Sequence, residues 1–162
     1  MKQDRFLTGI LIGIALLVVV ALVLFFVRKG NDSYVADDSV EGVLHNYVLA
    51  VQKQDYQKAY GYLADQDRKP TYEAFRRAFL NNEVFPGESG IEIRNVDITG
   101  EEALANLSII YLSNDPFSTG YTNDGNALLV KEGGEWKILQ MPYNYWGYDW
   151  YQPPAELAPV KP

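Results

Sequence analysis

Few side chains in this sequence could perform acid–base chemistry, and they are scattered. His45 is the only histidine. A general base needs a carboxylate partner or an oriented water within hydrogen-bond reach, and no Asp or Glu stands at a spacing that fixes one for His45. We therefore interpret His45 as a residue on the flank of a predicted helix and retain it as a candidate for the lining of a cavity.

Two further polar candidates, Asn95 and Asp97, alternate with Val96 and Ile98 in a predicted strand. Neighbouring side chains of a strand point to opposite faces, so only one of the two pairs can face the core. If Asn95 and Asp97 face inward, they line a polar pocket. If Val96 and Ile98 face inward, the polar pair is solvated, and this second arrangement needs no further assumption.

Metal and cofactor motifs are not recognisable in this sequence. It contains no cysteine, which excludes disulfides and thiolate metal sites. The run 123–126 (Asn-Asp-Gly-Asn) lacks the alternating acids and the distant Glu of a calcium loop, so it predicts a turn. P-loop, Rossmann, HExxH and nucleophile-elbow patterns do not occur. We expect no enzymatic activity, no metal and no cofactor.

Aromatic side chains are concentrated near the C-terminus. Tyr and Trp combine a large apolar area with a hydrogen-bonding tip, which suits protein interfaces, sugar stacking and the bilayer interface. Some of these rings could complete the core, or some could form an exposed recognition surface, and we favour a protein partner for such a surface. The candidates are Tyr143, Tyr145, Trp146, Tyr148, Trp150 and Tyr151.

The first 29 residues resemble a membrane anchor. Residues 6–27 contain no charged side chain, and at about 1.5 Å per residue they would cover a hydrocarbon core of roughly 30 Å. A cleaved signal has a shorter apolar region and a small-x-small cleavage site. The prediction is a single-pass protein of the cell membrane with residues 1–29 as an uncleaved anchor. The charges that flank the span are nearly balanced, and the short N-terminal tail favours an extracytoplasmic domain.

The charge of the chain is unevenly distributed. The whole sequence carries −7; residues 1–29 contribute +3, so the remainder carries −10. Phosphate backbones would repel such a domain. We therefore expect no nucleic-acid partner.

Residues 30–37 form a predicted linker, and three helices follow it. The sequence 38–41 (Asp-Ser-Val-Glu) has capping-box spacing and precedes an apolar stripe of helical period that ends at Val51. A second helix is predicted after Asp55, and a third after Thr71, with both residues acting as N-caps.

Four strands are predicted after the helices, at residues 91–98, 103–112, 127–132 and 135–140. Gly133 and Gly134 separate the last two, and paired glycines favour the tight turn of a β-hairpin. The prediction is an α+β fold of about three helices on a curved antiparallel sheet of about four strands. It places the domain at residues 38–145 and an aromatic, proline-rich tail at 146–162.

This pattern resembles the NTF2-like (cystatin-like cone) superfamily, in particular its membrane-anchored bacterial members. The motifs that carry the resemblance are 55–60 (Asp-Tyr-Gln-Lys-Ala-Tyr) and 129–138 (Leu-Val-Lys-Glu-Gly-Gly-Glu-Trp-Lys-Ile). They indicate a fold and not a reaction, since the superfamily includes isomerases, cyclases and non-enzymatic domains. The cavity candidates that the resemblance implies are His45, Tyr60, Asn95, Asp97, Tyr111 and Trp136.

Two functions follow as hypotheses. The first is a non-enzymatic binding or accessory module, a protein-interaction subunit of a larger membrane assembly that contacts the bilayer through residues 6–27. The alternative is a small-molecule-binding or isomerase/cyclase-type domain that uses the cone cavity. Homodimerisation through the outer face of the sheet, which the resemblance implies, is compatible with both.

Overall fold

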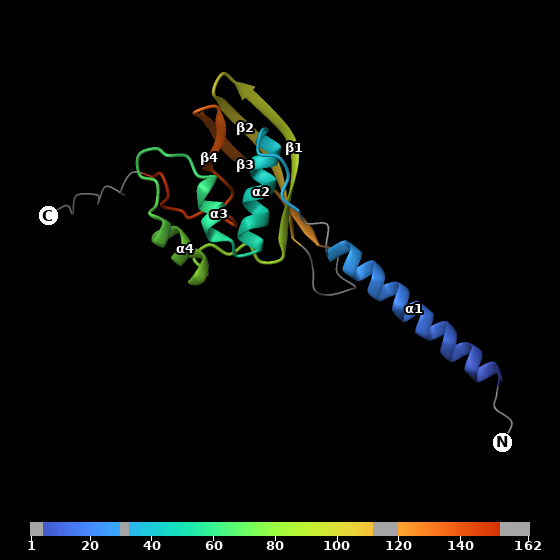
Figure 1. Cartoon of the computed structure of the whole chain (residues 1–162). Coiled ribbons are helices and arrows are strands. Elements are labelled where there is room, and N and C mark those ends of the chain that lie inside the picture. Colours follow the sequence, from blue (N-terminus) through green and yellow to red (C-terminus); the bar gives the residue numbers. More distant parts are fainter. Residues whose placement is uncertain (1–4, 30–32, 112–119, 153–162) are drawn as a thin grey trace. The chain divides into compact units, whose positions relative to one another are not determined.

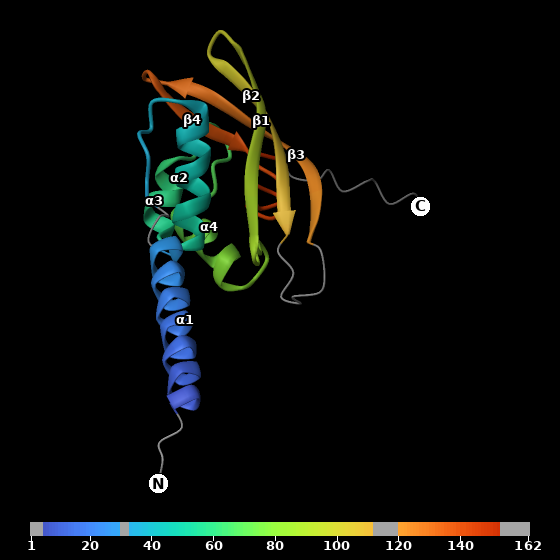
Figure 2. The same cartoon turned by 90° about the vertical axis from the view of Figure 1, so that its right-hand side faces the viewer.

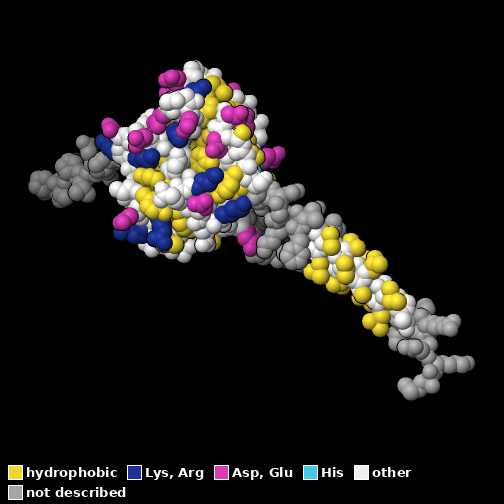
Figure 3. All heavy atoms as spheres, in the orientation of Figure 1, with side chains coloured by type: hydrophobic (Ala, Val, Ile, Leu, Met, Phe, Trp, Pro, Cys, Tyr) yellow, Lys and Arg dark blue, Asp and Glu magenta, His cyan; other side chains and the backbone are white. Residues whose placement is uncertain are grey.

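The computed structural model describes residues 5–29, 33–111 and 120–152. It divides the chain into two compact units, Met1–Ser33 and Tyr34–Pro162. The first unit contains helix α1 (Arg5–Lys29), whose described side chains are exposed and mostly apolar (Figure 3). The second unit contains every other described element and is treated by itself below.

The predicted membrane span is contradicted. Within the described residues, we find no helix that combines the length and the apolar character needed to cross a bilayer. The predicted single-pass location in the cell membrane, with its extracytoplasmic domain, is corrected accordingly.

Three helices begin at side-chain caps. Helix α2 (Val40–Gln52) starts at Ser39, whose hydroxyl accepts the Gly42 N–H at 3.0 Å, one residue later than the predicted cap. Helices α3 (Tyr56–Gly61) and α4 (Tyr72–Leu80) start at the two predicted caps, Asp55 and Thr71. In each of these helices the cap oxygen accepts an orphan N–H of the first turn.

The sheet has four antiparallel strands in sequence order: β1 (Ser89–Thr99), β2 (Glu102–Tyr111), β3 (Tyr121–Glu132) and β4 (Glu135–Gln140). A bulge between Ile93 and Asn95 shifts the register of β1 against β2. Gly133 and Gly134 both have positive φ and form the β3–β4 turn, as the paired glycines predict. Figures 1 and 2 show α2, α3 and α4 on one face of this sheet.

The predicted turn at residues 123–126 is wrong, because β3 runs through it from Tyr121. These residues pair with Ile109 to Asn106 of β2. A Cβ built on Gly125 would lie 2.8 Å from the Ile109 side chain and 2.9 Å from Pro142. Pairing and close packing with β2 therefore outweigh the local preference of Asn, Asp and Gly for turns.

The space between helices and sheet is filled by a single apolar core. Tyr47 and Leu44 of α2, Phe75 of α4, and Leu107 of β2 are fully buried in it. The outer edge of β4 is covered by the segment after α3, where the Ala64 N–H donates to the Ile138 carbonyl at 2.9 Å and the Ile138 N–H donates to Tyr62 at 2.7 Å. This pairing fixes the start of the loop between α3 and α4.

Candidate functional site

The three polar candidates from the sequence lie at the surface. His45 is exposed on α2. Asn95 and Asp97 are exposed on the face of β1 opposite the core, and the Asn95 amide donates to the Asp97 carboxylate at 2.9 Å. The bulge before Asn95 leaves Val96 and Ile98 opposite Ala105 and Ala103, both buried residues of β2. The structure therefore does not bring these three side chains together inside the cone.

The three aromatic cavity candidates lie in different surroundings. Trp136 is buried in the core, and the Tyr60 hydroxyl donates to the Pro70 carbonyl at 2.9 Å. Tyr111 stacks on Tyr121 with ring centroids 4.4 Å apart, and its hydroxyl donates to Asn144 at 2.9 Å. Tyr111 lines a cavity of about 330 Å³ beside β3.

The C-terminal aromatic segment, residues 143–151, is divided between core and surface. Tyr145, Trp146 and Trp150 are buried, and Tyr151 is half-buried. Tyr143 is 67% exposed and Tyr148 is 80% exposed. The segment therefore contributes Tyr145, Trp146 and Trp150 to the core and leaves Tyr143 and Tyr148 at the surface.

Tyr145 anchors the segment to the body of the domain. Its hydroxyl donates to the Ser89 carbonyl at 2.8 Å and lies 3.0 Å from the Ser89 hydroxyl, at the start of β1. Its own carbonyl accepts the Tyr47 hydroxyl at 2.6 Å. Burial raises the pKa of Tyr145, so its hydroxyl stays protonated as a donor.

The two tryptophans pack into a cluster of rings. Trp150 lies 5.0 Å from Phe75 and 5.1 Å from Trp146, measured between ring centroids. Gly147 makes this packing possible, because a Cβ there would lie 2.4 Å from the Trp150 ring. Edge-to-face and offset contacts of this kind stabilise aromatic clusters beyond the area they bury.

The exposed tyrosines stand beside a shallow groove. The rings of Tyr143 and Tyr148 contact each other, with centroids 5.9 Å apart and planes inclined by 33°. The groove has a volume of about 270 Å³. We call it the aromatic groove; its lining includes Gln66, Asp67, Leu139, Gln140, Tyr143, Trp146, Tyr148, Trp150 and Gln152.

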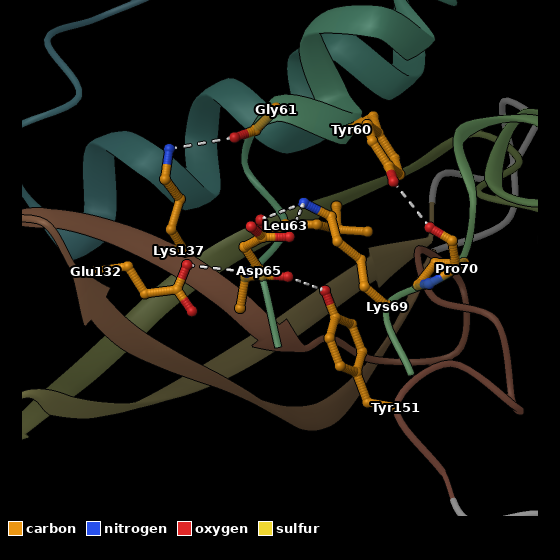
Figure 4. A network of polar contacts seen from close by, with 10 residues as sticks. Tyr60, Gly61, Leu63, Asp65, Lys69, Pro70, Glu132, Lys137 and Tyr151 are labelled. Atoms are coloured by element: carbon orange, nitrogen blue, oxygen red, sulfur yellow. Dashed lines mark hydrogen bonds and ion pairs between the residues drawn. The ribbon is translucent and has the colours of Figure 1, made fainter. Parts of the chain in front are cut away.

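One wall of the aromatic groove is the loop 65–69, which polar contacts hold in place (Figure 4). The Asp65 N–H donates to the Glu132 carboxylate at 2.8 Å. Lys69 donates to the Leu63 carbonyl at 3.2 Å, and its ammonium lies 4.8 Å from the centre of the Tyr60 ring. The loop therefore presents Gln66 and Asp67 from a backbone tied to α3 and to the β3–β4 hairpin.

Tyr151 connects this wall to the aromatic segment. Its hydroxyl donates to the Ala64 carbonyl at 2.5 Å, and its ring stacks on Trp146 with centroids 5.8 Å apart. Burial is the main reason that the pKa of Tyr151 is raised well above its usual range, and the negative charge of Glu132 adds to the effect. Tyr151 is therefore a neutral hydrogen-bond donor that joins the two walls.

Sequence reasoning missed the polar part of the groove. Gln66, Asp67, Gln140 and Gln152 line it but belong to three separate segments. A run of polar residues between two helices is typical of any surface loop. The sequence carries no signal that would pair residues 66–67 with the aromatic segment.

The polar groups of the described interior are satisfied within the fold. Within the described residues, every buried side-chain nitrogen and oxygen has a hydrogen-bond partner. In the same part of the chain, no group of three His, Asp or Glu side chains could hold a metal ion. The chemistry that these residues support is binding through rings, amides and one carboxylate.

Comparison with known proteins supports the fold. Neither a family model nor a curated protein sequence matches the chain. A solved structure from Thiobacillus denitrificans, described as a calcium/calmodulin-dependent protein kinase type II association domain, is 9% identical with a TM-score of 0.50. The match covers 64% of this chain and 91% of the chain in that structure. This likeness supports the α+β fold, with helices on one face of an antiparallel sheet.

Two other solved structures are similar to the chain with lower scores. A SEC-C motif containing protein from Rhodopseudomonas palustris is 11% identical, with a TM-score of 0.48, and covers 66% of this chain and 80% of its own. An uncharacterised cystatin fold protein from Novosphingobium aromaticivorans is 14% identical, with a TM-score of 0.41. The match covers 60% of this chain and 95% of the chain of that protein. At these identities the comparisons describe the fold alone.

Proposed function

We propose that this domain is a non-enzymatic protein-binding module whose contact surface is the aromatic groove. One observation carries the proposal: Tyr143 and Tyr148 are exposed on a segment that Tyr145, Trp146 and Trp150 anchor in the core. Exposed tyrosines on a fixed backbone are effective anchors, because little side-chain freedom is lost when they bind.

The described interior supports binding over catalysis. Its polar side chains are satisfied within the fold, and a packed core of Tyr47, Phe75, Trp146 and Trp150 occupies the space between helices and sheet. The partner should carry basic groups, because residues 30–162 carry −10 and complementary charge speeds association. The similar association domain adds support for self-association as one form of this binding.

The proposal is tested by site-specific photocrosslinking in cells that produce the full chain. A crosslinker at position 148 should give a discrete product, identified by mass spectrometry as a partner or a second copy of this chain. We expect Tyr143→Ala to lower the yield at least tenfold. Phe85, which is 64% exposed outside the groove, is the matched control position, and Phe85→Ala should leave the yield unchanged. An equal yield from positions 85 and 148 would refute the proposal.

Small-molecule binding is a second candidate function, supported by the cavity of about 330 Å³ beside β3. Tyr111, Asn123 and Asn144 line it, and the Tyr111 hydroxyl is held by Asn144. Its volume is near the lower end of ligand pockets, which run from about 300 to 1,000 Å³. Ligand-induced NMR shifts that include Tyr111 and exclude Tyr148 would favour this function.

A further inference from the structure

We propose that the edge of β3 from Thr122 to Asn126 binds an extended, basic segment of a partner protein, which adds to the sheet as a further antiparallel strand. Along this stretch β3 pairs with β2 on one side, and its pairing with β4 begins only at Leu128. Within the described residues no strand occupies the other side there, and Figure 2 shows this part of β3 at the margin of the sheet. The assignment of the edge to the partner of the aromatic groove rests on the proposed function, whereas the binding of a strand at this edge does not.

The register determines which main-chain groups of β3 face outward. The Lys131 N–H donates to the Glu101 carbonyl at 2.8 Å, so these two residues form a hydrogen-bonded pair of the antiparallel ladder. Such pairs alternate along a ladder, and the register of β2 against β3 contains no shift. The odd-numbered residues of β3 therefore bond to β2, whereas Thr122, Asp124 and Asn126 direct their N–H and carbonyl groups away from it.

The cavity beside β3 lies along these outward groups. Four consecutive residues of β3, 123–126, line it. Because neighbouring side chains of a strand point to opposite faces, a cavity that touches four residues in a row runs along the edge of the strand. Its opposite wall is formed by residues 140–144, where the chain leaves the sheet after β4. The cavity is therefore a groove beside an open strand edge, which is the arrangement that strand addition uses.

The charge at the centre of this edge argues against a second copy of the chain as the occupant. Two copies related by a two-fold axis would pair their outward stretches about the centre and place Asp124 opposite Asp124. Like charges directly opposite each other destabilise a sheet. Arg94 lies 3.1 Å from the Asp124 carboxylate, but it compensates only part of the charge, because both side chains are largely exposed. A charged residue on an edge strand is a common protection against such self-pairing.

A basic side chain suits the same position. In a hydrogen-bonded antiparallel pair the two side chains lie on the same face of the sheet, so a partner residue opposite Asp124 places its side chain beside that carboxylate. Lys or Arg there would also be attracted by residues 30–162, which carry −10. The alternate residues of the segment face the other side of the sheet, where Ile109, Tyr111 and Pro142 line the groove. The segment that fits therefore alternates basic and apolar residues.

This edge adjoins the aromatic groove. Gln140, Met141 and Tyr143 line both the aromatic groove and the cavity beside β3. A single extended segment can therefore contact the exposed Tyr143 ring and pair with β3. The two surfaces together form one continuous contact area for one partner.

Amide hydrogen exchange on the full chain is the first test. The probe is a synthetic hexapeptide of alternating Lys and Val, acetylated at its N-terminus and amidated at its C-terminus. Saturating peptide should slow the exchange of the Thr122, Asp124 and Asn126 amides at least fivefold. The amides of Asn123 and Gly125, which bond to β2 with or without the peptide, should change by less than twofold.

N-methylated versions of the hexapeptide separate strand pairing from charge attraction. In the proposed register the lysine N–H groups face β3 and the valine N–H groups face away from it. Methylation of the three lysine amides should therefore raise the Kd at least tenfold, whereas methylation of the three valine amides should raise it less than threefold. Both versions carry the same charge, so binding by charge alone would not distinguish them.

Matched variants of the chain test the same edge. Asn126→Pro removes one outward N–H at a position where an edge strand tolerates proline, and it should raise the Kd of the hexapeptide at least fivefold. Asn126→Ala keeps the N–H and should change the Kd by less than twofold. Asp124→Asn should raise the Kd at least twofold, whereas Asp97→Asn, which removes an exposed acid of β1, should not. Circular dichroism verifies that each variant is folded, and the methylated peptides decide the matter if Asn126→Pro is not.

Three outcomes would overturn the proposal: no saturable binding of the hexapeptide, equal or reversed effects of the two methylations, or protection that does not alternate along β3. These measurements use the purified chain and do not depend on crosslinking. If crosslinking at position 148 finds a partner while the hexapeptide does not pair with β3, the proposed function stands and this inference fails. If the hexapeptide pairs with β3 while crosslinking finds no partner, the proposed function fails and the edge remains a binding site for a strand.

Discussion

The hydroxyl of Tyr47 donates a hydrogen bond of 2.6 Å to the main-chain carbonyl of Tyr145, across 98 positions of the sequence. Both side chains are fully buried. This contact ties helix α2 to the aromatic segment, and Tyr145 in turn binds Ser89 at the start of β1. The backbone that presents Tyr143 and Tyr148 is therefore fixed by the core.

Tyr47→Phe should destabilise the domain by about 1–3 kcal/mol, because the ring is kept while the buried Tyr145 carbonyl loses its donor. Urea unfolding followed by circular dichroism measures this change. Tyr148→Phe is the matched control; since Tyr148 is 80% exposed, its effect should stay within about 0.5 kcal/mol. Equal effects of the two substitutions would contradict the role given to the Tyr47 hydroxyl.

Truncation of single rings should separate the buried part of the aromatic segment from its exposed part. Trp150→Ala should lower the free energy of unfolding by about 3–5 kcal/mol, because it opens a cavity beside Phe75 and Phe79. Tyr143→Ala should change it by less than about 0.5 kcal/mol. Thermal unfolding of the two variants checks the difference, and a large loss for Tyr143→Ala would show that this residue belongs to the core.

Gly147→Ala should destabilise the domain by about 1–3 kcal/mol, because the added methyl group would overlap the Trp150 ring. Gly61→Ala is the control with the opposite sign. Nothing lies within 4 Å of a Cβ at Gly61, in helix α3, so alanine there should stabilise by about 0.4–1 kcal/mol. The comparison uses the urea midpoints of unfolding. An unchanged midpoint for Gly147→Ala would mean that the segment shifts with no loss in the free energy of unfolding.

Stability should fall as pH rises between about 10 and 12. Burial, and a hydrogen bond to Asp37, raise the pKa of Tyr62 to about 12, whereas the unfolded chain has the usual value of about 10. In this window the unfolded state releases a proton that the folded state retains, so unfolding becomes more favourable. Below pH 10 the contribution of Tyr62 is fully present.

Urea midpoints measured from pH 9 to 11.5 check this dependence. Tyr62→Phe removes the titrating hydroxyl and should reduce the decline. It should not abolish it, because burial also raises the pKa of Tyr47 and Tyr145. An unchanged slope in Tyr62→Phe would remove Tyr62 as a source of the pH dependence.

Prediction from sequence was most accurate where the determining contacts are local. Asp55 and Thr71 cap helices because each side chain reaches an N–H three residues ahead. Gly133 and Gly134 make a turn because two successive residues need positive φ. The N-cap of α2 is Ser39 and not the preceding Asp. Asp and Ser are about equally favourable as N-caps, so the local sequence does not distinguish the two positions.

Prediction failed where packing with distant segments decides. The run 123–126 has turn-forming residues, yet pairing with β2 makes it a strand. The order of aromatic residues from 143 to 151 follows no helical or strand period, so it could not indicate which rings are buried. The polar wall at Gln66 and Asp67 depends on a loop whose position is fixed by contacts with Glu132 and Leu63. This loop is far from the aromatic segment in the sequence.

The sequence by itself therefore determined the α+β class, the caps, the hairpin and the presence of an aromatic surplus, because each depends on residues within a few positions of one another. Only the tertiary structure decided that Tyr145, Trp146 and Trp150 complete the core while Tyr143 and Tyr148 face solvent. The physical reason is that burial in an irregular segment is set by the space that other elements leave. Here that space is bounded by Tyr47, Ser89 and Phe75, and none of them is close to this segment in the chain.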